Sequence, residues 1–336
     1  MKNPLVSILI PTYNRANFIA DTIQSALNQD YNNFEVIVGD NASTDASWAI
    51  IQRIAEVDSR VRPFRNDANV GPVRNWIECV RRARGTLSKI LWSDDLIDPS
   101  YLSRTVPLLA DQRLSFVYTS VRIFRDYPDP KFDLIYYSNL PTGVYDSLLF
   151  IEGSLLDSSN YPVSPGCFLL RTKDLNENLM ADIPNAVGSD FNSHAIGNDL
   201  LLLMLTASSY ERFGVINEPL SMFRDHPGSI STKSGTGRLI LHYDLAKAYF
   251  VLEHVIDKDL RRRFNTSLWL HLQRYKAETF GIRCIQDFYP APADTRISIP
   301  HLLHRAFRRM LRLTRPLLSH RVITAHTLKA ITSDKV

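Results

Sequence analysis

Short apolar runs alternate with longer amphipathic stretches along the first third of the chain. Residues 6–10 form a nearly continuous apolar run that we expect to end at Pro11, and residues 17–29 place apolar side chains at helical spacing. Such runs are typical of buried strands, and the spacing is typical of helices that cover a sheet. The other elements of this region are expected as strands at 34–38, 61–64 and 87–92, and as helices after 45, at 72–83 and after Pro99. The pattern predicts the α/β class, with a Rossmann-type, mostly parallel central sheet flanked by helices.

Beyond about residue 112 the alternation is less regular. We expect strands at 115–124, 167–170 and 213–216, a helix at 198–208, and loops at 126–141 and 219–231. From residue 238 onward the spacing is helical, with an interruption at 290–292. The pattern therefore predicts one large domain over 1–234, with halves 1–111 and 112–234, and a mainly helical extension over 235–336.

The charge of the chain is distributed unevenly. Residues 1–257 hold 23 Lys and Arg against 30 Asp and Glu, whereas residues 258–329 hold 15 against 4. Such a basic segment is compatible with nucleic acid, an anionic membrane surface or an acidic lipid-linked substrate, and composition alone leaves these open. The segment lacks the interleaved aromatic residues or the recognised motif typical of nucleic-acid binding, so we expect no nucleic-acid partner.

The basic segment contains an amphipathic helix, which we expect at 301–315. One side is expected to carry Leu302, Leu303, Ala306, Phe307, Met310 and Leu311, and the other side largely Arg305, Arg308, Arg309, Arg312 and Arg315. A basic amphipathic helix is typical of proteins that lie on an anionic membrane. The alternative is that its apolar stripe packs on the body of the protein or on a second subunit.

Composition excludes several classes of protein. A chain of 336 residues with 45% apolar and 22% charged residues is neither disordered nor collagen-like. Its longest uninterrupted apolar run, 200–205, is too short to cross a bilayer, and its N-terminus lacks a signal-peptide pattern, so we expect a cytoplasmic protein. The cysteines are odd in number and widely spaced, so we expect buried thiols rather than disulfides or a zinc site; they are Cys79, Cys167 and Cys284.

Acidic residues follow several of the expected elements. Asp40 comes directly after the second strand, and Asp94 and Asp95 follow the fourth. Asp199 opens the helix at 198–208. Ligands of a parallel α/β sheet collect at the carboxyl ends of its strands, so these acids are candidate functional residues. Any one of them could be a turn former or a helix cap, but their joint placement favours a site.

Four motifs occur in an order typical of one enzyme family: VSILIPTYNR (6–15), EVIVGDNASTD (35–45), NVGPVRN (69–75) and WSDD (92–95). With these motifs, the chain resembles the family-2 glycosyltransferases of bacterial surface-polysaccharide and O-antigen synthesis over residues 4–231. The resemblance implies the GT-A fold, in which the half 1–111 binds a nucleotide-sugar and the half 112–234 binds the acceptor. It also implies transfer with inversion and a divalent cation, Mn²⁺ or Mg²⁺.

The resemblance implies a nucleotide site built from these motifs. Asp40 is expected to accept a hydrogen bond from the base, because a carboxylate can read the imide N–H of a uracil or thymine ring. Arg74 is expected near the phosphates, where a guanidinium binds diphosphate oxygens; its alternative is to extend into solvent or to pair with a neighbouring acid. The expected nucleotide set is Pro11, Thr12, Tyr13, Asp40, Asn69, Gly71, Arg74, Asp94 and Arg224.

The same resemblance implies a metal site and a general base. Asp95 is expected to bind the metal and Asp94 the metal or the ribose, with His226 as a third ligand. The family often has a further acid where Ser93 stands, but one or two carboxylates with substrate phosphates suffice for a hard cation. Asp199 is expected to deprotonate the acceptor, although Asn replaces the acid that usually precedes it, and Asp190 is the reserve base.

We therefore expect a metal-dependent glycosyltransferase that moves a sugar from a nucleoside diphosphate, UDP favoured, to a hydroxyl of a glycan or lipid-linked acceptor. If the helix at 301–315 docks on lipid, the protein is peripheral at the inner face of the cell membrane. One rival is a non-catalytic nucleotide- or carbohydrate-binding relative, against which the intact acids argue. Another is a nucleotidyltransferase, which would more naturally carry a Gly-rich, basic phosphate loop, and residues 11–17 are not one.

Overall fold

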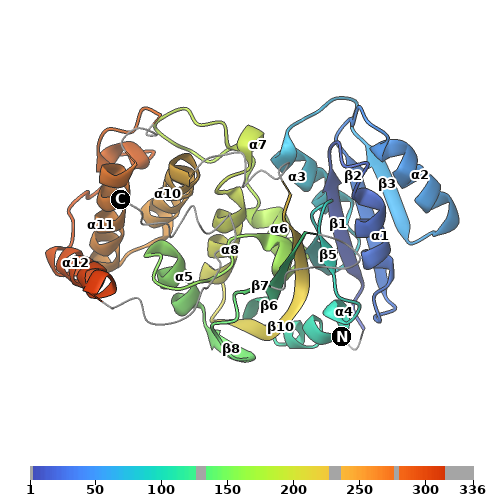
Figure 1. The fold of residues 1–336 in the computed structure, drawn as a ribbon, viewed down its shortest axis with the longest axis horizontal. Coiled ribbons are helices and arrows are strands. Elements are labelled where there is room, and N and C mark those ends of the chain that lie inside the picture. Colours follow the sequence, from blue (N-terminus) through green and yellow to red (C-terminus); the bar gives the residue numbers. More distant parts are fainter. Residues whose placement is uncertain (1–2, 126–133, 227–235, 276–279, 315–336) are drawn as a thin grey trace. The chain divides into compact units, whose positions relative to one another are not determined.

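The computed structural model describes residues 3–125, 134–226, 236–275 and 280–314 of the chain (Figure 1). The chain divides into two compact units. Unit 1 comprises residues 1–154, 160–182 and 190–226, and unit 2 comprises 155–159, 183–189 and 227–336. Parts of the loops expected at 126–141 and 219–231, and the end of the helix expected at 301–315, lie outside the described residues.

One mixed sheet organises unit 1. Its strand order is β3-β2-β1-β4-β9-β6-β10-β5, while β7 pairs with β6 and β8 with β10. The pairs β3-β2, β2-β1, β1-β4 and β6-β10 are parallel, and β9 is antiparallel to both of its neighbours. The strands are β1 (Val6–Thr12), β2 (Phe34–Asp40), β3 (Val61–Arg65), β4 (Leu87–Ile90), β5 (Leu96–Ile97), β6 (Leu114–Phe124), β7 (Leu134–Tyr136), β8 (Gly143–Asp146), β9 (Phe168–Arg171) and β10 (Arg212–Arg224). The predicted α/β class with a central, helix-flanked sheet is confirmed.

Helices cover both faces of the parallel part of the sheet (Figure 1). The helices are α1 (Ile19–Leu27), α2 (Ser47–Val57), α3 (Pro72–Arg82), α4 (Tyr101–Thr105), α5 (Ser147–Leu155), α6 (Thr172–Asn178), α7 (Phe191–His194), α8 (Asn198–Ser208), α10 (Thr236–His254), α11 (Lys258–Arg274) and α12 (Ile299–Thr314), with 3₁₀ turns η1 (Leu108–Ala110), η2 (Pro165–Cys167) and η4 (Ile285–Phe288). Side chains alternate along a strand, so Val36 and Val38 join the core beneath α1 and α2, while Gly39 faces Cys79 of α3. This two-sided burial explains why the strands are apolar throughout.

The parallel register aligns the carboxyl ends of β1, β2 and β3. Thr12 lies opposite Asp40, and Asp40 lies opposite Arg65. Polar residues that are far apart in the sequence therefore meet at one edge of the sheet, where a ligand of an α/β fold is expected.

Two prolines lie inside strands that the sequence pattern ended too early. Pro11 is buried within β1 and lies opposite Gly39, so the prediction that Pro11 ends this strand was wrong. Likewise, β10 passes through Pro219 and continues to Arg224, where a loop was expected. Its pairing with β6 has a register irregularity between Ile216 and Ser221, which accommodates a residue that cannot donate to the ladder. This extension carries Arg224 to the edge where Asp95 lies.

Among the described residues of unit 2, helix α11 packs against both α10 and α12, and buried apolar residues such as Leu245 and Leu268 lie in these helices. Arg305 of α12 points inward, where it donates to the Leu156 carbonyl (3.2 Å) and to Ser267 Oγ (3.1 Å). Leu303 and Phe307 are 64% and 55% exposed. The expected division of this helix into an apolar side and a basic side is therefore wrong for Arg305, because its guanidinium satisfies polar groups of the body that an apolar side chain would leave without a partner.

Two further expectations have a clear outcome. Cys79 and Cys167 are buried free thiols as predicted, but Cys284 is exposed, because it lies in the turn that leads into η4. Within the described ranges, no helix is both long and apolar enough to span a bilayer.

Glu35 is a buried acid that links the beginnings of β1, β2 and β3. Its carboxylate accepts hydrogen bonds from Ser7 Oγ (2.7 Å) and from the Arg84 amide (2.7 Å), and it pairs with Arg62. Burial raises the pKa of Glu35, but these hydrogen bonds outweigh burial and leave the pKa below its ordinary value. Because the folded-state pKa is depressed, the stabilising contribution is present above the unfolded-state pKa and is lost as the pH falls through the folded value.

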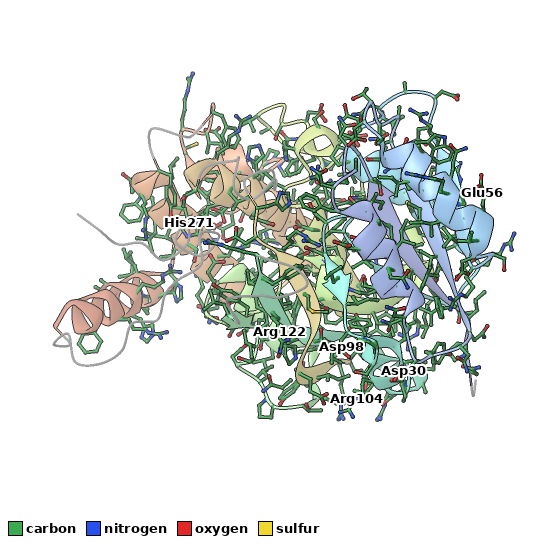
Figure 2. The ribbon with its side chains drawn as sticks, turned by 45° about the vertical axis from the view of Figure 1, so that its right-hand side comes forward. Asp30, Glu56, Asp98, Arg104, Arg122 and His271 are labelled. Carbon is green, nitrogen blue, oxygen red and sulfur yellow. The ribbon has the colours of Figure 1, made fainter. Side chains whose placement is uncertain are left out.

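We predict that Glu35→Gln lowers the free energy of unfolding at neutral pH by about 1.5–3 kcal/mol, the range for hydrogen bonds to a charged group. Below about pH 4.3, the ordinary glutamate pKa, the difference from the wild type should shrink. Urea unfolding from pH 3 to pH 7 measures both effects. Glu56→Gln is the matched control, since Glu56 is an exposed acid on α2 (Figure 2). A pH-independent difference for Glu35→Gln would contradict the role of its charge.

Candidate active site

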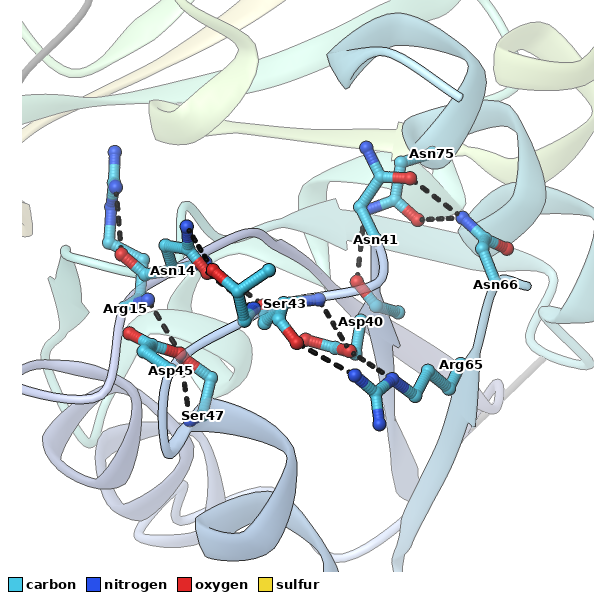
Figure 3. A network of polar contacts seen from close by, with 12 residues as sticks. Asn14, Arg15, Asp40, Asn41, Ser43, Asp45, Ser47, Arg65, Asn66 and Asn75 are labelled. Atoms are coloured by element: carbon cyan, nitrogen blue, oxygen red, sulfur yellow. Dashed lines mark hydrogen bonds and ion pairs between the residues drawn. The ribbon is translucent and has the colours of Figure 1, made fainter. Parts of the chain in front are cut away.

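The loops that follow β1 and β2 are joined by hydrogen bonds between backbone and side chains (Figure 3). The Asn14 amide donates to Ser43 Oγ (2.9 Å), and the Arg15 amide donates to Ser47 Oγ (2.8 Å). Asp45 accepts from the Ala16 amide (3.1 Å) and also from the amide of Ser47, in the first turn of α2. The two loops thus form one unit at the edge of the sheet.

Asp40 is fully buried beneath this pair of loops. One carboxylate oxygen, Oδ2, accepts a hydrogen bond from the Ser43 amide (3.1 Å) and forms an ion pair with Arg65 Nε (3.1 Å; Figure 3). The other oxygen, Oδ1, is buried and has no hydrogen-bond partner among the described residues. A buried acceptor without a donor is costly, so this oxygen is suited to a ligand that brings an N–H or O–H group.

Asn41 organises the loop that precedes α3. Its Nδ2 donates to Asn69 Oδ1 (2.8 Å) and to the Gly71 carbonyl (3.2 Å). Its Oδ1 accepts from the Val70 amide (3.0 Å) and from Asn66 Nδ2 (3.0 Å). Asn69 Oδ1 therefore serves to hold this loop, since it also accepts from the Gly71 amide.

Asn192 of α7 packs against Gly71 and holds the start of α3, because its Nδ2 donates to the Val70 carbonyl (2.9 Å). Gly71 has φ +88°, and an added Cβ would meet Asn192 Nδ2 at 2.4 Å. Asn192 Oδ1 also accepts from the Arg74 amide (3.0 Å) at the start of α3, where helix amides lack partners in their own helix. The Arg74 side chain is exposed and pairs with Asp182 (3.2 Å), which is the alternative that the sequence had left open.

Two arginines and a histidine surround the acidic pair after β4. Asp94 Oδ2 lies 3.1 Å from Arg15 Nε and 3.0 Å from His226 Nε2. The Asp94 carbonyl accepts from Arg224 Nε (2.9 Å), and Asp95 Oδ1 accepts from the Arg224 amide (2.8 Å). The structure thus brings together the predicted residues Asp94, Asp95, Arg224 and His226, which come from two distant parts of the chain.

The two acids have opposite pKa shifts. Burial alone raises the pKa of Asp94, but the hydrogen bond from His226 and the charge of Arg15 outweigh it, so that the pKa is lowered. Burial and the charge of Asp94 raise the pKa of Asp95 well above its ordinary value. Burial also lowers the pKa of Lys89 to about 7, although the charge of Asp95 acts in the opposite direction. The Lys89 ammonium donates to the Gly166 carbonyl and lies 4.6 Å from the Tyr101 ring centroid.

A divalent cation fits the chemistry of this cluster. In the part of the chain that the structure describes, no three His, Cys, Asp or Glu side chains already converge as a metal site. A hard cation needs only one or two carboxylates when phosphates supply further oxygens, and it would relieve the repulsion that raises the pKa of Asp95. Asp94 and Asp95 are therefore suitable ligands, with the His226 imidazole beside them.

The remaining predicted residues occupy separate positions. Thr12 is buried and its carbonyl accepts from the Asn41 amide (2.8 Å), whereas the adjacent Tyr13 is 41% exposed. Asp199 is buried at the start of α8, and its Oδ1 accepts from the amides of Gly197 (3.1 Å) and Leu200 (2.8 Å). Asp190, the reserve base, is exposed and caps α7 through Ser193.

Sequence reasoning assigned no role to Arg15, Asn41 and Lys89. Arg15 and Asn41 lie within quoted motifs, so their presence in the loops was visible. Only the fold shows that Arg15 reaches Asp94 and that Asn41 reaches the loop before α3. A lysine inside an apolar strand is a signal that could have drawn attention to Lys89, because a buried cation requires a polar partner.

The structure is an α/β fold in which Asp40 and the pair Asp94 and Asp95 lie at the ends of parallel strands. Ligands of such folds bind at this edge of the sheet. The family profile described as Glycosyl transferase family 2 matches residues 7–179. The chain belongs to this family. WfaP of Escherichia coli, named UDP-Glc:alpha-D-GlcNAc-diphosphoundecaprenol beta-1,3-glucosyltransferase, is 33% identical over 123 residues, which cover 37% of this chain and 48% of WfaP. The chain spans about half the length of the curated relatives that it matches.

Solved structures confirm the fold. Residues 1–349 of Staphylococcus aureus TarS, crystallised with UDP-GlcNAc, superpose with a TM-score of 0.60 at 17% identity, over 84% of this chain and 77% of that chain. The mannosyltransferase PcManGT of Pyrobaculum calidifontis, in complex with GDP-Man and Mn²⁺, gives a TM-score of 0.52 at 16% identity, over 94% of this chain and 82% of that chain. At these identities the similarity establishes the GT-A-like fold alone.

Proposed function

We propose that this protein is a glycosyltransferase that moves a sugar from a nucleoside diphosphate, UDP favoured, to a hydroxyl group of a glycan or lipid-linked acceptor. The transfer is a single displacement with inversion. The acceptor oxygen forms a bond to the anomeric carbon, the bond from that carbon to the diphosphate breaks, and the nucleoside diphosphate leaves with the electron pair. Relatives support this proposal: TarS was crystallised with UDP-GlcNAc, and WfaP is named as using UDP-Glc.

The observation that carries the proposal is the buried carboxylate of Asp40. Its Oδ2 is held by Ser43 and Arg65, while its Oδ1 has no partner among the described residues. The imide N–H of a uracil ring is a donor of the right kind for this oxygen, whereas the corresponding edge of cytosine offers no N–H at the ring nitrogen. Pro11, Thr12 and Tyr13 complete the nucleoside side of the proposed site, and Asn69 and Gly71 shape its neighbouring loop.

Asp94 and Asp95 are the residues that would hold a divalent cation, with His226 as a further ligand and Asp94 alternatively facing the ribose. A bound Mn²⁺ or Mg²⁺ would supply positive charge that stabilises the leaving diphosphate. Arg224 contributes further positive charge beside this pair, since its side chain donates to the Asp94 carbonyl. Arg74 is exposed at the start of α3 and would have to exchange Asp182 for a diphosphate oxygen.

Proton removal from the acceptor hydroxyl is assigned to Asp199. The amides of Gly197 and Leu200 orient one of its carboxylate oxygens, so the side chain is held rather than free to rotate. Residues 1–111 form the proposed nucleotide-sugar half, 112–234 the acceptor half, and 235–336 a helical extension. A lipid-linked acceptor, like the one in the name of WfaP, would keep a cytoplasmic enzyme at the inner face of the cell membrane.

We predict that Asp40→Ala weakens UDP binding by about 1.5–3 kcal/mol, the range for a hydrogen bond to a charged group. Titration calorimetry with UDP, CDP and GDP measures the effect on each base. Glu56→Ala, at an exposed acid on α2, is the control. An equal loss for all three nucleotides would show that Asp40 does not read the base.

We predict that Asp95→Asn weakens Mn²⁺ binding by about tenfold or more, because one of two anionic oxygen ligands becomes neutral. The amide oxygen can still accept from the Arg224 amide, so the thermal unfolding midpoint should change little. Electron paramagnetic resonance of free Mn²⁺ measures binding without any turnover, and Glu56→Gln, at an exposed acid on α2, serves as the control. Unchanged Mn²⁺ affinity would remove Asp95 from the metal site.

We predict that Asp199→Asn lowers the transfer rate by about 10²–10⁴, the scale for loss of a general base. UDP affinity should stay near that of the wild type, because the amide keeps an acceptor for Gly197 and Leu200. Release of nucleoside diphosphate across a panel of nucleotide-sugars and lipid-linked acceptors measures the rate. Asp190→Asn is the matched control, since Asn also caps helices well. A wild-type protein that binds UDP without turnover across the panel would favour the non-catalytic rival.

A further inference from the structure

The described part of α12 carries a row of apolar side chains that face away from the body of unit 2. Ile299, Leu303 and Phe307 are 57%, 64% and 55% exposed. They follow one another at intervals of four residues, so they lie along one face of the helix. We call these three residues the apolar row.

The side of α12 that contacts unit 2 is distinct from the apolar row. Arg305 reaches the Leu156 carbonyl and Ser267 Oγ, and Leu302 and His301 are only partly exposed. On a helix with 3.6 residues per turn, Arg305 lies about 160–200° from the members of the apolar row at 303 and 307. The helix is therefore fixed by its polar side, and the apolar row is presented outward.

The surroundings of the apolar row are basic. His304 and Arg308 are exposed on the same helix, and the described residues 295–314 contain no Asp or Glu. A second copy of the chain would bring an equally basic helix against this one, and like charges at an interface are costly. A bilayer that contains anionic lipids offers an apolar interior beneath a negative surface, which complements both features.

A hollow of about 610 Å³ lies near the beginning of α12 and is lined by Arg262, Thr295, Arg296 and Ile297. Within the described residues, Nε of Arg262 is buried without a hydrogen-bond partner, the charge of Arg262 acts on Asp294, and Arg296 pairs with Asp294. Ser298, which directly precedes α12, donates its amide to the Arg262 carbonyl (3.2 Å). The hollow and the apolar row are thus parts of one region of unit 2, and the two arginines that line the hollow add positive charge suited to a phosphate group.

We propose that this region docks on an anionic phospholipid bilayer, with the apolar row among the acyl chains and a lipid phosphate beside Arg262. Docking deepens the proposed function, because a lipid-linked acceptor would lie at such a surface. It does not depend on catalysis, since none of these residues belongs to the proposed transfer site. It also replaces the expected membrane contact through Arg305, which is occupied inside unit 2.

Co-sedimentation of the full chain with phosphatidylcholine vesicles, with and without phosphatidylglycerol, tests the proposal. The wild type should bind the anionic vesicles more tightly, and added salt should weaken this preference. The double substitution Leu303→Ser and Phe307→Ser should reduce binding by about tenfold or more, because two large apolar side chains no longer enter the bilayer. Ile256→Ser is the matched control, since Ile256 is 93% exposed in the same unit but lies outside the apolar row.

A second variant tests the phosphate contact separately. Arg262→Gln should weaken binding to vesicles with phosphatidylglycerol and abolish most of their advantage over phosphatidylcholine, whereas Arg283→Gln, at an exposed arginine of unit 2 that does not line the hollow, should leave both unchanged. Equal vesicle binding by the wild type and the double Ser variant would overturn the proposal. So would a wild type that does not bind vesicles and forms a dimer that the Ser substitutions dissociate.

The same variants separate docking from catalysis. Donor turnover with a soluble acceptor should persist in the double Ser variant, because the apolar row is remote in sequence from the transfer motifs. Lost vesicle binding with retained turnover supports the docking proposal. If the protein turns over no donor but still binds vesicles through the apolar row, the proposed function is refuted and the docking proposal is retained.

Discussion

The parallel pairing of β1, β2 and β3 is the constraint on which the candidate site depends. It sets Thr12, Asp40 and Arg65 side by side at one edge of the sheet. A carboxylate without access to water is costly unless donors surround it, and Arg65 and the Ser43 amide meet this need for one oxygen of Asp40. The second oxygen is left for a ligand. A shift of one residue in register would turn these side chains to the opposite faces of the sheet and separate them.

A second constraint acts at the end of β4, where two acids are adjacent in the sequence. Neighbouring carboxylates repel, and burial of Asp95 increases the cost of its charge. The protein places Arg15, His226 and Arg224 around the pair, and these residues come from the loop after β1 and from the end of β10. The acidic pair therefore connects the loop after β1 to the end of β10, and these charged contacts hold the candidate site together.

Polar contacts between charged or titratable side chains join the segments of unit 2. Lys247 of α10 pairs with Asp157 (2.7 Å), and His271 of α11 contacts Asp244 (2.8 Å) and lies near Asp157. These contacts anchor residues 155–159 against two helices, and Arg305 of α12 bonds to the adjacent Leu156 carbonyl. Because the inner side of α12 is occupied by polar contacts, its apolar side chains at 303 and 307 face solvent. The orientation of this helix follows from hydrogen bonding rather than from its hydrophobic pattern.

The sequence by itself determined the α/β class, the order of most strands and helices, and the acids that follow the strands. Those features depend on local periodicity and on the residue types next to strand ends, and both can be read from residues that are close together in the sequence. It did not determine that β1 and β10 continue through Pro11 and Pro219, because strand pairing can tolerate a proline that local rules treat as a breaker. Nor could it show that Arg15 meets Asp94 or that Arg305 points inward. Such contacts join residues about 80 to 150 positions apart, and only the tertiary structure, by satisfying buried polar groups across the chain, decides them.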